Sequence, residues 1–300
     1  MEVLELNVWP GDWGLPSLDL ECLQVLVYAK FNGINVKVNY TNPYNAPYGR
    51  LPVLQTDMSK LDTAEKIIAY FKEKQCSNSE DRLAPEECAT ALAYANLLRD
   101  KLYPALQFIW WIDKKNVDEL IRPWYCRTLP FPIKFYYPGK FERQSRTLFE
   151  CLYPIEDNIT DIENKVYSDA RKCLTLLSTR LEDSNYFFGD SPTILDATLY
   201  SYLALLLKIP LPNPTLQNHL KACTNLVKYV SRISQMYFEH ENQEYEQRKA
   251  DENTHTVKKD SESEFPNKRR NQVFAGVFAT LAMAVYAVSN GLVRKSVILN

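Results

Sequence analysis

The sequence predicts an α/β N-terminal part, an all-helical second part and a C-terminal transmembrane helix. Three observations predict this architecture. Strand and helix patterns alternate over residues 4–71, helical periodicity dominates beyond residue 85, and residues 271–293 carry no charged side chain. A chain of 300 residues has room for two modest domains ahead of such a membrane segment.

The N-terminal part begins with a strand, because apolar and polar residues alternate over residues 4–8. A helix follows, with Ser17 as its predicted N-cap and apolar residues at helical spacing over 18–29. Gly33 ends this helix, since glycine readily takes the left-handed conformation found there. Residues 36–40 then form a second strand, and the intervening helix predicts that the two strands are parallel.

A proline lies inside the next apolar run, residues 51–54. Pro52 requires either a sheet edge or a cis peptide bond, because it donates no backbone hydrogen bond. A helix with apolar residues at 64, 67, 68 and 71 comes next. The order of strand, helix, strand, proline-led strand and helix predicts a thioredoxin-like domain over residues 1–75.

The second part of the chain is predicted to be a helical domain over residues 85–240, after a linker at 76–84. Pro85 suits a first helical turn, and a capping box of Thr193 and Asp196 starts a helix that is apolar on nearly all sides. Helices are also predicted over 162–181 and 216–230.

Residues 241–270 contain eight acidic and seven basic side chains and few apolar ones. We expect a flexible tether here, because such a segment cannot bury enough apolar surface to fold.

The 23 uncharged residues at 271–293 would reach roughly 35 Å as a helix, enough to cross a hydrocarbon core of about 30 Å. So few residues follow that insertion must occur after synthesis, which predicts a tail anchor with most of the chain facing the cytosol. The predicted anchor residues are Val273, Phe274, Ala275, Gly276, Val277, Phe278, Ala279, Leu281, Val285, Val288, Leu292 and Val293. The flanking basic residues are Lys268, Arg269, Arg270, Arg294 and Lys295. A span that is rich in alanine and flanked by basic residues favours the mitochondrial outer membrane.

Several classes of function find no support in the sequence. The net charge of −2 offers no large basic field for nucleic acid, and the seven cysteines include no C-x-x-C pair. The three histidines have no partner at a metal-ligand spacing, and no phosphate-binding or nucleophile-elbow motif occurs. We therefore predict no catalytic residue, no cofactor and no metal site, and we interpret the lone cysteines as buried apolar residues.

A thioredoxin-like part followed by a helical part resembles the glutathione transferases. In that fold the proline-led strand would contain a cis-proline, and a Glu-Ser pair opening the next helix would bind the γ-glutamyl carboxylate of glutathione. Those two positions hold Thr63 and Ala64 here. The catalytic Tyr, Ser or Cys after the first strand is replaced by residues 9–14, and we assign Ser17 to helix capping. The scaffold is therefore expected to remain without its chemistry.

The chain is identified more specifically as a member of the metaxin family, within which it is similar to the tail-anchored members. No single motif is decisive; the order and spacing of the motifs carry the resemblance. They are residues 11–17 (GDWGLPS), 111–113 (WID), 130–132 (PFP), 138–140 (PGK), 173–178 (CLTLLS) and 187–190 (FFGD).

This resemblance implies a non-enzymatic subunit of the mitochondrial outer-membrane sorting and assembly machinery, which inserts β-barrel proteins. The implied partners are a second metaxin and the β-barrel subunit, and the cristae-organising complex and motor adaptors stay open. Two alternatives remain: a membrane-tethered glutathione-dependent transferase, and mainly a motor or tethering adaptor. Residues 122–141 combine aromatics with four prolines, so they either form a partner-binding loop or pack between the two domains.

Overall fold

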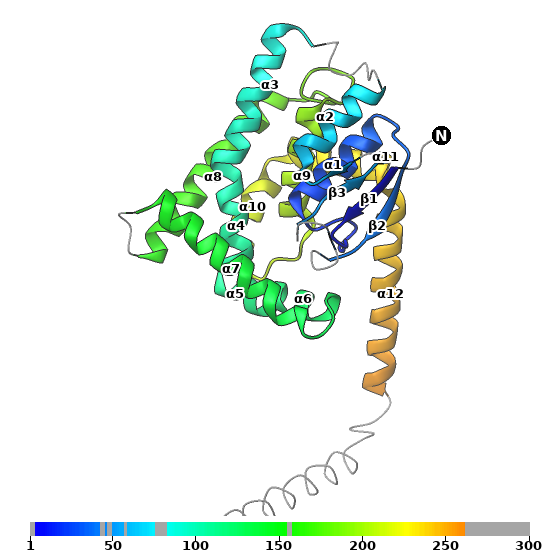
Figure 1. The fold of residues 1–300 in the computed structure, drawn as a ribbon. Coiled ribbons are helices and arrows are strands. Elements are labelled where there is room, and N and C mark those ends of the chain that lie inside the picture. Colours follow the sequence, from blue (N-terminus) through cyan, green and yellow to red (C-terminus); the bar gives the residue numbers. More distant parts are fainter. Residues whose placement is uncertain are drawn as a thin grey trace, which may run out of the picture. The chain divides into compact units, whose positions relative to one another are not determined.

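A computed structural model describes residues 4–42, 46, 50–56, 59–75, 83–154 and 158–261. The chain as far as Glu246 forms one compact unit, and Gln247 begins a second. The predicted domains at 1–75 and 85–240 thus both lie in the first unit (Figure 1).

The N-terminal sheet has the strand order β2-β1-β3-β4. Strand β1 (Leu4–Val8) pairs in parallel with β2 (Val36–Tyr40) and antiparallel with β3 (Val53–Gln55), which pairs with the short β4 (Lys60–Leu61). The predicted parallel pair is confirmed, and the Leu51–Pro52 peptide bond is cis.

Helix α1 (Leu20–Phe31) follows β1, and α2 (Ala64–Gln75) follows β4. The N-cap of α1 is Asp19, whose carboxylate accepts a hydrogen bond from Cys22 N–H at 2.9 Å. The prediction of Ser17 as the cap is therefore wrong. Ser17 is fully buried, and its hydroxyl accepts a hydrogen bond from Asp19 N–H at 3.3 Å just ahead of the helix.

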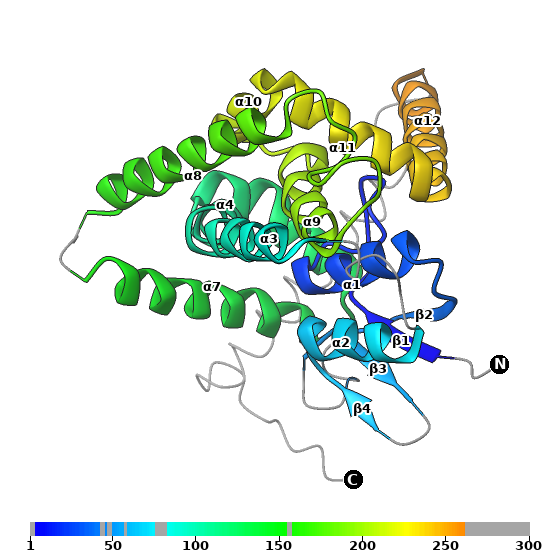
Figure 2. The ribbon, with the colours of Figure 1, turned by 90° about the horizontal axis from the view of Figure 1, so that it is seen from above.

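The helical part surrounds α9 (Ile194–Lys208), most of whose side chains are buried. Its predicted capping box is confirmed, since the Asp196 carboxylate accepts a hydrogen bond from Thr193 N–H at 2.9 Å. Helix α1 lies between the sheet and α9 (Figure 2), and Gln24 of α1 donates to the Thr198 hydroxyl of α9 at 2.7 Å. The other helices are α3 (Pro85–Leu97), α4 (Tyr103–Trp111), α5 (Lys114–Asn116), α6 (Arg122–Thr128), α7 (Ile133–Leu152), α8 (Ile159–Leu181), α10 (Thr215–Ala222) and α11 (Thr224–Tyr237).

The single helix predicted over 216–230 is in fact two helices that meet at Cys223, whose ψ of 77° is not helical. Asn225 explains the break, because its side-chain amide donates to the backbone carbonyls of Ser178 and Glu182 at the end of α8. These tertiary bonds fix where α11 begins, and apolar periodicity alone does not reveal them.

The predicted flexible tether is wrong for the part that the structure describes, because α12 covers Glu239–Ser261. A lack of apolar residues argues against a buried core but not against a helix. The segment is rich in Glu, Gln, Lys and Arg, which favour helices. Side chains one turn apart also interact, as Gln243 does when it donates to Glu239 at 2.9 Å. The predicted linker at 76–84 falls largely outside the described residues.

Candidate functional site

A cleft of about 1270 Å³ separates the start of α1 and helix α2 from helices α4 and α7. This concave feature, which both parts of the chain line, is our candidate functional site. Aromatic side chains from both parts of the chain line it: Trp9, Tyr103, Trp110, Trp111, Tyr125, Phe141 and Tyr202.

A carboxylate of the chain itself occupies the N-terminus of α2. Glu21 Oε2 accepts a long hydrogen bond of 3.5 Å from Ala64 N–H, the first amide of that helix. Desolvation of the carboxyl group raises the pKa of Glu21, and the neighbouring Asp19 carboxylate raises it further. The helix end that could receive an external carboxylate therefore already faces an internal one.

The two positions that open α2 offer little to a ligand. Thr63 accepts a hydrogen bond from Lys66 N–H at 3.4 Å, and Ala64 is buried and has no polar side-chain atom. Neither side chain carries a positive charge, and the Thr63 hydroxyl is the only polar group that the two side chains offer to a bound anion. The predicted loss of the glutathione anchor agrees with this geometry.

The loop after β1 contributes packing to the cleft. Trp9 packs edge-on against Tyr125, with ring centroids 5.7 Å apart. Asp12 accepts a hydrogen bond from the indole N–H of Trp124 at 3.0 Å, which joins this loop to α6. Ser17 does not line the cleft. Where a transferase would carry its catalytic hydroxyl or thiol, this chain places buried aromatic side chains.

The described cysteines differ in burial, and Cys223 is intermediate. Cys22 and Cys173 are buried, as predicted, and burial raises the pKa of Cys173 to about 12, so its thiol stays protonated at neutral pH. Cys88, Cys126 and Cys151 are exposed, which contradicts the interpretation of the cysteines as buried apolar residues. No group of three potential metal ligands occurs among the described residues.

The aromatic segment at 122–141 is helical for most of its length, since α6 and α7 cover it apart from 129–132. The prediction of a loop is therefore wrong. Packing between the two parts of the chain is confirmed for Trp124, Tyr125 and Tyr137, which are buried, whereas other aromatic side chains reach solvent. The exposed aromatic residues are Phe131, Phe135 and Tyr136.

The predicted membrane anchor at 271–293 and its flanking basic residues lie outside the described residues. Within the described ranges, no helix combines the length and the apolar character needed to cross a bilayer.

Comparison with known proteins identifies the family. The chain is 40% identical to metaxin-1 of Bos taurus over 97% of its own length and 91% of that protein. It is 39% identical to metaxin-3 of Xenopus laevis over 79% of its length and 77% of that protein. The chain belongs to the metaxin family. A metaxin-1 homolog of Drosophila melanogaster is 32% identical over 97% of the chain and 90% of that protein. The family predicted from the sequence motifs is confirmed.

Two family models match parts of the chain. One, described as "Outer mitochondrial membrane transport complex protein", matches residues 22–142. The other, described as "Glutathione S-transferase, C-terminal domain", matches residues 170–233.

Solved structures confirm the predicted transferase-like fold. Glutathione transferase F7 from Populus trichocarpa matches with a TM-score of 0.53 and 14% identity, over 81% of this chain and 99% of that one. A glutathione S-transferase of Ceriporiopsis subvermispora, solved in complex with glutathione, matches with a TM-score of 0.52 and 14% identity, over 78% of this chain and 97% of that one. At this identity the likeness concerns the fold alone.

Sequence reasoning did not find the contact between Glu21 and Ala64, although it identified Ala64 as an altered position. Glu21 is an ordinary residue in the first turn of a helix, and 43 positions separate it from Ala64. Only the packing of α1 beside α2 brings the two together. Two cues were available: an acidic residue in the first turn of α1, and an alanine where a polar anchor is expected.

Proposed function

We propose that this protein is a non-enzymatic subunit of the mitochondrial outer-membrane sorting and assembly machinery, where it supports the import and insertion of β-barrel proteins. Its similarity to metaxin-1 over almost its whole length supports this role. So does the family model described as an outer mitochondrial membrane transport complex protein. The proposed partners are a second metaxin and the β-barrel subunit of that machinery.

The observation that carries the non-enzymatic part of the proposal is the state of the α2 N-terminus. The transferase-like fold is retained, but Ala64 stands at the amide where an anchor is needed, and Glu21 faces that amide. A bound tripeptide carboxylate would meet two acidic side chains that line the cleft, Asp19 and Glu21, at close range. Like charges in a partly desolvated site oppose binding. The fold is therefore suited to serve as a docking body.

Attachment to the membrane is the second part of the proposal. Residues 271–293 would form the tail anchor, and the body would face the cytosol. The uncharged length of this segment and the basic residues on both sides support this assignment.

One experiment tests both parts in mitochondria. The full chain is compared with a chain that ends at residue 270, and with one whose segment 271–293 is replaced by an unrelated outer-membrane tail anchor. We expect the full chain and the replaced chain to resist carbonate extraction, to co-purify with a β-barrel subunit and to support the assembly of newly imported barrels. The truncated chain should be released to the cytosol. A full chain that is soluble and without a barrel partner would contradict the proposal.

The glutathione alternative has its own test. The full chain in detergent should not be retained on immobilised glutathione and should not conjugate a standard electrophile. Retention that free glutathione reverses would instead favour the transferase.

A further inference from the structure

The connection between α6 and α7 exposes aromatic side chains to solvent. We call residues 127–140 the aromatic turn. Phe131 is 78% exposed, Phe135 64% and Tyr136 57%, whereas the large side chains next to them in sequence, Leu129 and Tyr137, are buried. The rings of Phe131 and Phe135 pack edge-on, with centroids 6.2 Å apart. An exposed aromatic cluster of this kind marks a surface that binds something apolar.

The charge of the aromatic turn is entirely positive. No acidic residue occurs over 123–141, whereas Arg127, Lys134 and Lys140 lie within the turn. The ammonium group of Lys134 lies 5.3 Å from the ring centre of Phe135, and that of Lys140 lies 5.7 Å from the ring centre of Tyr137. Within the described ranges, none of the three basic side chains takes part in an ion pair. The aromatic rings are therefore bordered by cations that are available to an anionic partner.

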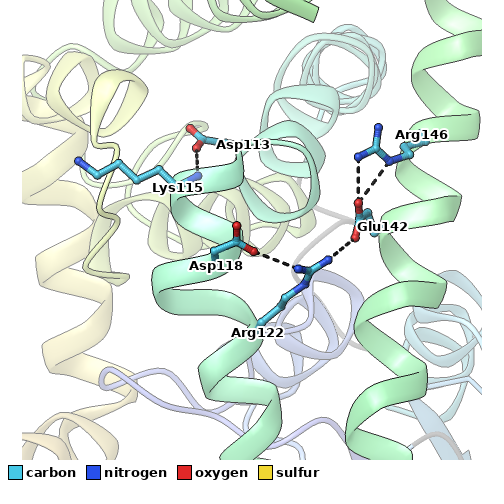
Figure 3. A network of polar contacts seen from close by, with 6 residues as sticks. All are labelled: Asp113, Lys115, Asp118, Arg122, Glu142 and Arg146. Carbon is cyan, nitrogen blue, oxygen red and sulfur yellow. Dashed lines mark hydrogen bonds and ion pairs between the residues drawn. The ribbon is translucent and has the colours of Figure 1, made fainter.

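An ion-pair network holds the base of the turn (Figure 3). Arg122 at the start of α6 contacts Asp118 at 3.0 Å and Glu142 of α7 at 2.7 Å. Arg146 contacts the other oxygen of Glu142 at 2.9 Å. Although burial acts in the opposite direction, the two arginines lower the pKa of Glu142. Asp118 and Glu142 are thus already paired with arginines, and α6 is tied to α7.

We propose that the aromatic turn inserts its exposed rings into the headgroup region of an anionic lipid bilayer. This inference rests on the proposed membrane attachment, because the tail anchor would keep the body close to such a surface. Aromatic side chains favour the membrane interface, and lysine and arginine favour anionic headgroups. A protein groove could also accept Phe131 and Phe135, but it would not require a segment of 19 residues without an acidic side chain. Lipid therefore fits the combined pattern better.

Tryptophan quenching by brominated lipids tests the proposal with the full chain. All five native tryptophans are buried, so brominated acyl chains should barely quench them. The variant Phe131→Trp is reconstituted into brominated phosphatidylcholine vesicles with a minor fraction of phosphatidylinositol. If the turn inserts to the typical interfacial depth of about 5–10 Å, the new indole is quenched, and the variant loses roughly one sixth of the emission that it shows in non-brominated vesicles. The wild type should lose almost none. Phe135→Trp should behave in the same way.

The matched control is Leu92→Trp, because Leu92 is 64% exposed on α3, and α3 lies at the opposite end of the helical part from α6 (Figure 1). Its indole should stay in water without quenching. Replacing Lys134 and Lys140 by Glu in the Phe131→Trp chain should weaken the local partitioning of the turn by about 25-fold or more, since one basic side chain contributes roughly fivefold. The quenching should then disappear.

Flotation of the same vesicles separates the two proposals. If the chain floats but the indole introduced by Phe131→Trp emits like the one in the Leu92→Trp control, the inference is overturned while the tail anchor stands. If the chain does not float, the proposed membrane attachment fails, and the inference fails with it. Shielding of the turn that occurs only after a β-barrel partner is added would assign it to a protein interface and would also overturn the inference.

Discussion

The buried carboxylate of Asp196 permits a sharp prediction about the stability of the helical part. It is fully buried and accepts four hydrogen bonds. Oδ1 accepts from Phe187 N–H at 2.9 Å and from the Tyr229 hydroxyl at 3.1 Å. Oδ2 accepts from Thr193 N–H at 2.9 Å and from the Thr193 hydroxyl at 2.7 Å. One side chain thus joins the start of α9 to the preceding loop and to α11.

The substitution Asp196→Asn changes little in volume but removes one acceptor atom. The amide oxygen can keep two of the four bonds, whereas the amide nitrogen must face the other two donors. A hydroxyl can rotate to accept, but a backbone N–H cannot, and an unsatisfied buried N–H costs about 1–3 kcal/mol. The two retained bonds lose the ionised acceptor, at about 1 kcal/mol each. The expected loss of unfolding free energy is roughly 3–5 kcal/mol.

Thermal unfolding of the full chain in detergent, followed by tryptophan fluorescence, measures this loss. For a body of this size, in which 1 kcal/mol shifts Tm by about 2–4 °C, the expected decrease in Tm is roughly 6–20 °C. The control is Asp190→Asn, which makes the same chemical change at an exposed carboxylate whose hydrogen-bond partner among the described residues is Asn185, at 3.5 Å. If both variants unfold within about 1 °C of each other, the four bonds of Asp196 do not contribute the expected ~3–5 kcal/mol to the stability of the fold.

Three further predictions concern polar contacts of the body. Gly14 has a φ of +72°, and a Cβ added there would lie 2.6 Å from Asn242 Oδ1. Gly14→Ala should therefore lower the unfolding free energy, measured by urea titration, by about 2–3 kcal/mol. A loss below about 0.5 kcal/mol would contradict this prediction. Lys208 donates to Gly14 O at 3.0 Å and to Asn242 at 2.7 Å, and burial lowers the pKa of Lys208 to about 8. Above pH 8 the folded state therefore binds fewer protons than the unfolded state. The unfolding free energy of the wild type minus that of Lys208→Met should rise between pH 8 and about 9.5. If this difference in unfolding free energy does not change with pH, the Lys208 ammonium is not desolvated as described. Desolvation raises the pKa of Glu21, so the folded state binds more protons than the unfolded state below that raised pKa. The unfolding free energy of the wild type relative to Glu21→Gln should therefore rise as the pH falls through the raised pKa toward about 4.5. Equal pH profiles of the two proteins would show that the Glu21 carboxyl is not desolvated as described.

Patterns that act within one segment were readable from the sequence. Alternation over residues 4–8 and 36–40 predicted two parallel strands, and Thr193 with Asp196 predicted the start of α9. Pro52 predicted a special geometry. These predictions succeeded because a strand period, a cap and a proline each depend on covalent geometry and on neighbours a few residues away.

The sequence predictions failed where contacts between distant residues decided the structure, or where two neighbouring side chains could each cap the same helix. Asp19 rather than Ser17 caps α1, because its carboxylate reaches Cys22 N–H while Ser17 is buried ahead of the helix. The break between α10 and α11 follows from the bonds of Asn225 to α8. Charge content misled the prediction for the segment after residue 240, where helix propensity outweighs the lack of apolar residues.

The sequence by itself determined the family, the alternation of strands and helices up to α2, and the absence of a polar side chain at Ala64. Tertiary structure decided what replaces that anchor, because Glu21 meets Ala64 only when α1 packs beside α2. It also divided the aromatic residues over 122–141 into a buried set and an exposed set. Composition and periodicity state which side chains are apolar, but only the packing of α6 and α7 against the rest of the chain determines which of them remain in contact with solvent.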